Sequence, residues 1–131
     1  MPRALMVGIL LATLLCGCTS GLNRPVVSVN AVTDDRGVQR VDVDMHSFYF
    51  KPNRIVVHSG RPVELTVRNR ALIVPHNFTI AGSDVSVSVD KWGPGAKRVK
   101  FTPSTPGEYH FFCHVDHHGK KGMTGTLVVE P

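Results

Sequence analysis

Four side chains in the second half of the chain have the types and spacing of metal ligands. Cys113, His118 and Met123 form a Cys-x4-His-x4-Met cluster, and His76 lies upstream in the segment Val-Pro-His-Asn-Phe. One thiolate and two imidazoles suit copper in both of its common oxidation states, and a thioether can bind as a long, weak axial ligand. The set therefore predicts a mononuclear copper centre, and the chemistry of such a centre is one-electron transfer.

The loop after the cysteine contains more imidazoles than one copper site needs. His114, His117 and His118 all follow Cys113 within five positions. His114 alternates with Cys113 along a predicted strand, so its side chain should point away from the metal. The residues alone leave His117 and His118 as alternatives for the second imidazole ligand.

Other kinds of site fit these residues less well. Structural zinc sites usually pair cysteines at short spacing, and a binuclear copper centre would need a second cysteine in this loop, where only Cys113 is present. A nucleophilic cysteine needs a base and an orienting partner, whereas the methionine that completes the cluster favours a metal. Neither a phosphate-binding glycine loop nor a paired-carboxylate arrangement is evident in the sequence.

The N-terminus has the layout of an export leader. Residues 1–17 contain one arginine, an apolar run and then small residues, as secretory signal peptides do. The apolar run is shorter than the roughly 20 residues that a transmembrane helix needs. Because Leu15-Cys16-Gly17-Cys18 resembles a bacterial lipobox, we expect residues 1–17 to be removed and Cys18 to be lipidated. Cys16 is the poorer candidate, since the bulky Leu15 precedes it.

The cysteine count agrees with this processing. After cleavage and acylation of Cys18, Cys113 is the only thiol left, so the mature chain cannot form an internal disulfide. A single free thiol beside histidines in an exported protein indicates metal ligation. The mature chain has 114 residues, which fits one domain. We therefore expect a lipidated tether over residues 18–25 and a domain over residues 26–131.

The charge balance is mildly basic. The formal net charge is +5, and it falls to +4 when Arg3 leaves with the leader. The basic clusters, Lys97–Lys100 and Lys120–Lys121, are short and lack interleaved aromatic residues, so we predict no nucleic-acid partner. Because Lys120 and Lys121 lie between two candidate ligands, they should border the exposed edge of the metal. There they could steer an acidic redox partner by long-range attraction.

The rest of the chain predicts an all-β domain. Short apolar or alternating runs are bounded by Gly, Pro and Asn, and no stretch after the leader has sustained helical spacing. In one run, Val63, Leu65 and Val67 should face a core while the residues between them face water. About eight strands predict a two-sheet antiparallel Greek-key sandwich. The predicted strands cover Val26–Val32, Arg40–Phe50, Arg54–His58, Pro62–Asn69, His76–Ala81, Ala96–Phe101, Gly107–Cys113 and Met123–Glu130.

Several motifs together resemble a known family. They are Phe48-Tyr49-Phe50-Lys51-Pro52, Val74-Pro75-His76-Asn77-Phe78, Pro106-Gly107-Glu108-Tyr109, Phe112-Cys113 and Gly122-Met123-Thr124-Gly125. In this order they are similar to a plastocyanin-like cupredoxin, a type 1 blue copper protein. The resemblance extends from about Asp44 to Val129, and its combined ligand motif is highly specific.

The resemblance implies a role for each candidate residue. His76, Cys113 and His118 would be the equatorial copper ligands and Met123 the axial one. Asn77 resembles the family residue that ties the two ligand-bearing loops together, which would orient the ligands. The family often has a small hydroxyl residue after the cysteine, and this chain has a histidine there. That departure puts the direct tie from Asn77 in question.

The sequence thus predicts an electron carrier and not an enzyme. It would be a membrane-tethered blue copper protein that passes single electrons between redox partners outside the cytoplasm. A lipid would anchor it to the cell membrane or the outer membrane, with the domain facing the periplasm or the cell exterior. The alternative is a copper carrier or chaperone that delivers or buffers copper in the cell envelope and uses the additional histidines for transfer. A small copper enzyme is a third reading, and Met123 argues against it by filling the axial position.

Overall fold

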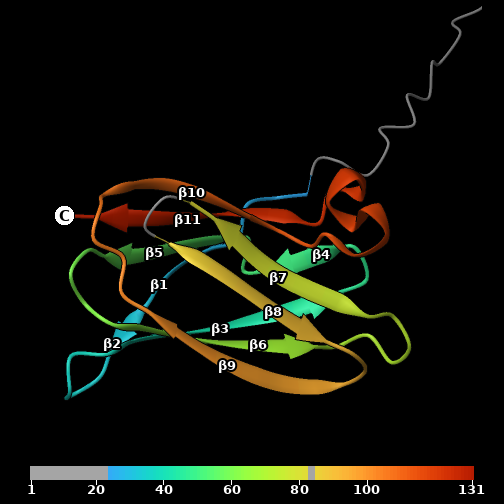
Figure 1. Cartoon of the computed structure of the whole chain (residues 1–131), viewed down its shortest axis with the longest axis horizontal. Coiled ribbons are helices and arrows are strands. Elements are labelled where there is room, and N and C mark those ends of the chain that lie inside the picture. The colour runs from blue at the N-terminus through green and yellow to red at the C-terminus, as the bar shows by residue number, and fades with distance from the viewer. Residues whose placement is uncertain (1–23, 83–84) are drawn as a thin grey trace, which may run out of the picture.

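The computed structural model of the chain describes residues 24–82 and 85–131, which form a sandwich of two β-sheets (Figure 1). The predicted leader over residues 1–17, the predicted lipidation site Cys18 and the tether as far as residue 23 lie outside the described residues. Within the described ranges, no helix has the length and the apolar character needed to cross a bilayer.

The first sheet contains six strands, and the metal-site residues belong to its side of the sandwich. Its order is β1 (Ser28–Asn30), β5 (Arg54–His58), β11 (Thr124–Glu130), β10 (Gly107–Phe112), β7 (His76–Ala81) and β8 (Ser86–Lys91). β1 and β11 both pair with β5 in parallel, and the other neighbours are antiparallel.

The second sheet has five strands. Its order is β2 (Val32–Thr33), β3 (Gln39–His46), β6 (Val63–Asn69) and β9 (Gly95–Phe101), and β4 (Tyr49–Lys51) pairs with β3. β3 and β6 are parallel, and the other pairs are antiparallel. One 3-10 helix, η1 (Val115–Lys121), connects β10 to β11.

The predicted sandwich is confirmed, but the prediction of about eight antiparallel strands is wrong. The described residues form eleven strands, and both sheets are mixed. The run Arg40–Phe50 divides into β3 and β4 because the chain reverses at Phe48, whose φ is +67°. The run Val26–Val32 divides at Ala31, where the chain crosses from the first sheet to the second.

One strand, β8, was missed by the sequence analysis. The sequence does alternate there, since Val87 and Val89 are buried while Ser86 and Ser88 are exposed. Two valines among serine, aspartate and lysine give too short an apolar run to stand out from a loop. Pairing with β7 along six register positions is what makes this segment a strand.

The hydrophobic core lies between the two sheets and reaches the end of the sandwich where the predicted metal ligands lie. Val63, Leu65 and Val67 are each 0% exposed, which confirms the predicted inward face of β6. Above them, Phe78 and Phe111 approach to 4.9 Å between ring centroids, and Phe50 contacts both rings edge-on. Such close aromatic packing holds the neighbouring side chains in fixed positions.

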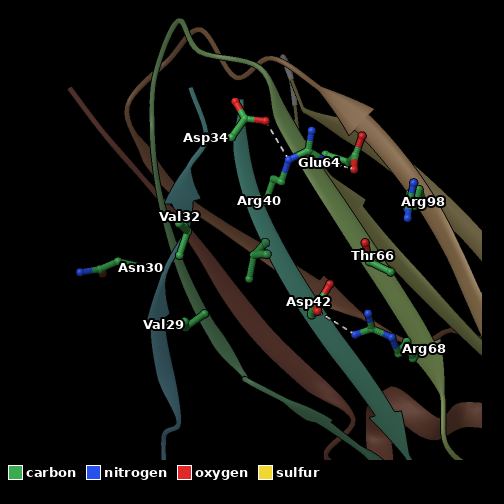
Figure 2. A pocket seen from close by; sticks show the side chains of 11 residues that line it. Val29, Asn30, Val32, Asp34, Arg40, Asp42, Glu64, Thr66, Arg68 and Arg98 are labelled. Carbon is green, nitrogen blue, oxygen red and sulfur yellow. Dashed lines mark hydrogen bonds and ion pairs between the residues drawn. The ribbon is translucent and has the colours of Figure 1, made fainter. Parts of the chain in front are cut away.

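The outer face of the second sheet is polar and internally paired. A depression of about 580 Å³ lies there. Figure 2 shows the side chains that line it: Arg40 lies between Asp34 and Glu64, and Arg68 reaches Asp42. Glu64 is buried, whereas the Arg68–Asp42 pair is open to solvent, and a solvent-exposed pair contributes roughly 0–1 kcal/mol to stability. Because these charges compensate one another across neighbouring strands, we assign no ligand to this depression.

Leu65→Ala should lower the free energy of unfolding by about 2–5 kcal/mol, because it leaves a cavity in a fully packed core. The matched control is Leu72→Ala, which makes the same chemical change at a side chain that is 80% exposed. The control should change the free energy of unfolding by less than about 0.5 kcal/mol. Denaturant unfolding curves of the two variants measure the difference, and equal losses would contradict the inward assignment of Leu65.

Candidate metal centre

Three of the predicted ligands meet at one buried point, although they come from separate parts of the chain. His76 opens β7, Cys113 follows β10 directly, and His118 lies in η1. Their ligand atoms all lie within 4.8 Å of one another. The three residues are 1%, 0% and 4% exposed, so the donors face an interior space and not bulk water.

Strand periodicity explains two of these positions. β7 and β10 are neighbours in the first sheet, and side chains two positions apart on a strand share a face. His76 therefore continues the inward row of Phe78, and Cys113 continues the inward row of Phe111. The two rows end at the same end of the sandwich, where the backbone N–H of Asn77 donates to Cys113 Sγ at 3.3 Å.

The third position is set by the loop fold. The Gly119 N–H donates to the Cys113 carbonyl at 2.9 Å, and the Met123 N–H donates to the His118 carbonyl at 3.0 Å. Asp116 and His117 adopt left-handed φ values of +42° and +60°. These bonds curl the loop back over Cys113 so that His118 Nδ1 lies 3.6 Å from Cys113 Sγ.

The structure separates the three histidines that follow the cysteine. His118 is buried in the cluster, whereas His114 and His117 are exposed. His114 Nδ1 lies 3.2 Å from Thr79 Oγ1, on the side of β7 opposite His76. The loop geometry thus distinguishes His118 from His117, which sequence spacing alone did not do.

The electrostatics of the cluster fit a bound metal. Both ring nitrogens of His76 are buried without a hydrogen-bond partner, and a buried polar atom of this kind ordinarily has one. Burial, with smaller contributions from the nearby His118 and His46, lowers the pKa of His76 to about 4. Burial likewise lowers the pKa of His118 and raises the pKa of the Cys113 thiol. One thiol and two neutral imidazoles form a buried site suited to one type 1 copper.

Met123 lies within the same packed region. Its side chain is 0% exposed and belongs to the core cluster that includes Cys113. Its carbonyl accepts from the Cys113 N–H at 3.1 Å, and its own N–H bonds to His118. The backbone thus ties the methionine to both loop ligands, and its side chain belongs to the same core cluster as Cys113.

The side chain of Asn77 ties the site to β8 and reaches the ligand loop only indirectly. Its Nδ2 donates to Asp90 Oδ1 at 2.8 Å and to Ser88 Oγ at 3.2 Å, and its Oδ1 accepts from Thr79 Oγ1. Thr79 Oγ1 in turn contacts His114. The sequence left open whether the Asn77 side chain contacts the residue after Cys113 directly. In the structure the contact is indirect, because Thr79 bridges Asn77 to His114.

Phe48 is a site residue whose role the sequence analysis missed. Its ring meets His118 edge-on at 4.9 Å between centroids. Lys121, on the ligand loop, places its Nζ 4.7 Å from the Phe48 ring centroid. The motif around Phe48 marked the position, but the left-handed turn that aims the ring at His118 depends on the pairing of β3 with β4. Phe48 partly covers the outer edge of the site.

The chain belongs to the cupredoxin-like family, because the family model described as Cupredoxin-like domain matches residues 7–129. The resemblance inferred from the motifs is thereby confirmed. No curated protein matched the chain.

Solved structures share the fold. Reduced auracyanin from the photosynthetic bacterium Roseiflexus castenholzii is 18% identical, with 77% of this chain and 99% of that chain covered and a TM-score of 0.66. Reduced rusticyanin is 20% identical, with 79% and 84% covered and a TM-score of 0.64. The metal-binding domain of the Streptococcus pneumoniae Cu(I)-exporting P-type ATPase CopA, solved with Cu(I), is 21% identical, with 82% and 100% covered and a TM-score of 0.65. At these identities the likeness is one of fold.

The metal-free protein should lose stability as the pH falls from about 6.5 towards 4. His76 takes up a proton near pH 6.5 in the unfolded chain and only near pH 4 in the folded one, so acid favours the unfolded state over this interval. The loss due to His76 should approach about 1.4 kcal/mol per pH unit. Denaturant unfolding at pH 7, 6 and 5 measures it. His76→Gln should flatten the dependence, and an unchanged slope in that variant would refute the assignment.

Proposed function

We propose that this protein is a mononuclear blue copper protein that carries single electrons between redox partners outside the cytoplasm. The observation that carries the proposal is the convergence of His76, Cys113 and His118 at one buried point, with two imidazole nitrogens of His76 left without partners. Family membership supports it, since the match spans nearly the whole chain.

Each residue has a distinct part in this function. His76, Cys113 and His118 would hold copper equatorially, and Met123 would be the weak axial donor. Bound copper would supply the one-electron chemistry by changing between Cu(II) and Cu(I). The N–H of Asn77, 3.3 Å from Cys113 Sγ, would stabilise the thiolate and fix its direction. Ligands that are buried in a close-packed core cannot reorganise much, which keeps the barrier to electron transfer low.

The edge of His118 is the proposed route for electrons. His118 is 4% exposed and lies under Phe48, which is half-buried. Lys120 and Lys121 are exposed on the same loop. An apolar rim bordered by lysines suits an acidic partner that forms a short-lived complex, because steering by charge accelerates encounter without requiring tight binding.

The proposed carrier is tied to a membrane by a lipid on Cys18. The lipobox-like sequence before this cysteine supports the anchor, with the domain facing the periplasm or the cell exterior. The domain contributes no membrane-spanning helix from its described residues. The proposed arrangement confines the carrier to two dimensions at the membrane surface.

A copper carrier or chaperone is the second candidate function, and one observation favours it. His110, His114 and His117 line a surface pocket of about 510 Å³ that also borders Cys113. Exposed imidazoles beside a buried thiol could receive copper before it reaches the site. In that function the metal itself would be the cargo, and the protein would release it to an acceptor.

Absorption spectra of a soluble chain over residues 19–131, loaded with Cu(II), test the proposed function. The native chain should show an intense blue thiolate-to-copper band, and Cys113→Ser should abolish it. Met123→Leu should keep the blue band and raise the reduction potential, because loss of the axial donor favours Cu(I). Electrochemistry measures that potential.

Two neighbouring histidines provide a matched control. His118→Asn should remove the blue band, whereas His117→Asn should leave it intact because His117 is exposed and outside the cluster. A pale complex that survives loss of Cys113 would indicate copper held by histidines alone. That outcome would sink the electron carrier and favour the chaperone.

A further inference from the structure

Three large apolar side chains stand on loop tips at the metal end of the sandwich. Leu72 and Ile73, in the loop between β6 and β7, are 80% and 90% exposed, and Trp92, after β8, is 73% exposed. The loop with Leu72 and Ile73 leads directly into His76. Exposed apolar residues in a cluster usually mark a contact surface, whereas scattered ones do not.

One buried side chain holds these two loops together. Asn69 is 2% exposed, and its Nδ2 donates to the Val74 carbonyl at 2.9 Å and to the Lys91 carbonyl at 3.1 Å. Its Oδ1 accepts from the Ala71 N–H at 2.9 Å. The backbone on both sides of Leu72 and Ile73 is thus held beside Lys91, the residue that precedes Trp92. The two loops that carry the three exposed side chains are therefore fixed next to each other.

The described chain also begins at this end of the molecule. The Arg24 guanidinium lies 4.1 Å from the ring centroid of Tyr49, and Tyr49 is the neighbour of Phe48, which packs on His118. From Cys18 to Arg24 the chain can span at most roughly 20 Å, at 3.3–3.6 Å per residue. A lipid on Cys18 would therefore keep the metal end close to the bilayer.

We propose that Leu72, Ile73 and Trp92 form a membrane-contact patch, which docks the metal end on the surface of the bilayer that holds the lipid anchor. This inference rests on the proposed anchor at Cys18. Tryptophan favours the interface between lipid and water, and aliphatic side chains add binding by burying apolar area among the acyl chains. The Lys91 ammonium donates to the carbonyls of Trp92 and Gly93 and so keeps a positive charge beside Trp92, which suits anionic head groups.

A bilayer fits this patch better than a protein partner does. Protein interfaces gain most of their affinity from side chains that enter complementary, well-packed pockets. Leu72, Ile73 and Trp92 instead project from two loop tips and are 73–90% exposed. A soft head-group layer accommodates such projections without a matching shape, and the short tether supplies the proximity.

The chain contains one tryptophan, so its fluorescence reports on the patch alone. The lipidated mature protein, free of copper, is reconstituted in vesicles that contain anionic lipids. The reference is the unlipidated Cys18→Ser protein in detergent-free solution. Relative to this reference, we expect the Trp92 emission of the vesicle-bound protein to shift to shorter wavelength. We also expect a loss of intensity when the vesicle lipids carry bromine on their acyl chains.

Two variants separate patch contact from simple tethering. The double change Leu72→Ser with Ile73→Ser should reduce both the shift and the quenching while the protein stays on the vesicles. Val32→Ser is the matched control, because Val32 is 72% exposed on β2, at the opposite end of the sandwich (Figure 1). The control should leave both signals unchanged.

Two results would overturn the inference. If the lipidated chain sediments with vesicles but Trp92 emission is neither shifted nor quenched, the patch does not touch the bilayer and is left to a protein partner. If the lipidated chain does not sediment with vesicles at all, the anchor fails and the inference fails with it. The blue copper band of the double variant is a separate readout, so a failed patch and a failed copper site remain distinguishable.

Discussion

The pairing of β7 with β10 is the interaction on which the rest of this structure depends. It places two inward rows side by side, so that Phe78 and Phe111 pack as a floor and His76 and Cys113 meet above it. Phe111 also excludes larger neighbours, since a Cβ on Gly125 would collide with its ring. The metal site is therefore an extension of the hydrophobic core, and its geometry is as well fixed as core packing allows.

Burial has a second consequence, which concerns protons. The core that positions His76 and Cys113 also withdraws them from water, so the imidazole stays neutral and the thiol resists ionisation while no metal is bound. Metal binding would displace the thiol proton, and the positive charge of the metal would compensate the thiolate. The orphaned nitrogens of His76 are costly in the metal-free fold. Stability and metal affinity are thus linked through the same three side chains.

Two buried asparagines organise the end of the sandwich where this happens. Asn77 binds β7 to β8 and, through Thr79, approaches the ligand loop, while Asn69 holds the loops that carry the exposed apolar patch. The metal site, the apolar patch and the beginning of the described chain consequently share one end. The opposite end carries none of the residues that we assign to function. A carrier that exchanges electrons at a membrane surface would benefit from this polarity.

The sequence by itself determined the ligand types, the family and the sandwich, because ligand chemistry and strand periodicity are local properties of residues and their spacing. It identified His76, Cys113, His118 and Met123 as candidates, and the inward face of β6 was correct. Tertiary structure decided what depends on contacts between distant segments. The parallel pairs, the strand β8, the left-handed turn at Phe48, the burial of His118 in place of His117 and the threonine bridge from Asn77 all arise from pairing across the fold. Local patterns are not enough to fix these features, since the partner strand supplies the hydrogen bonds and the burial that they depend on.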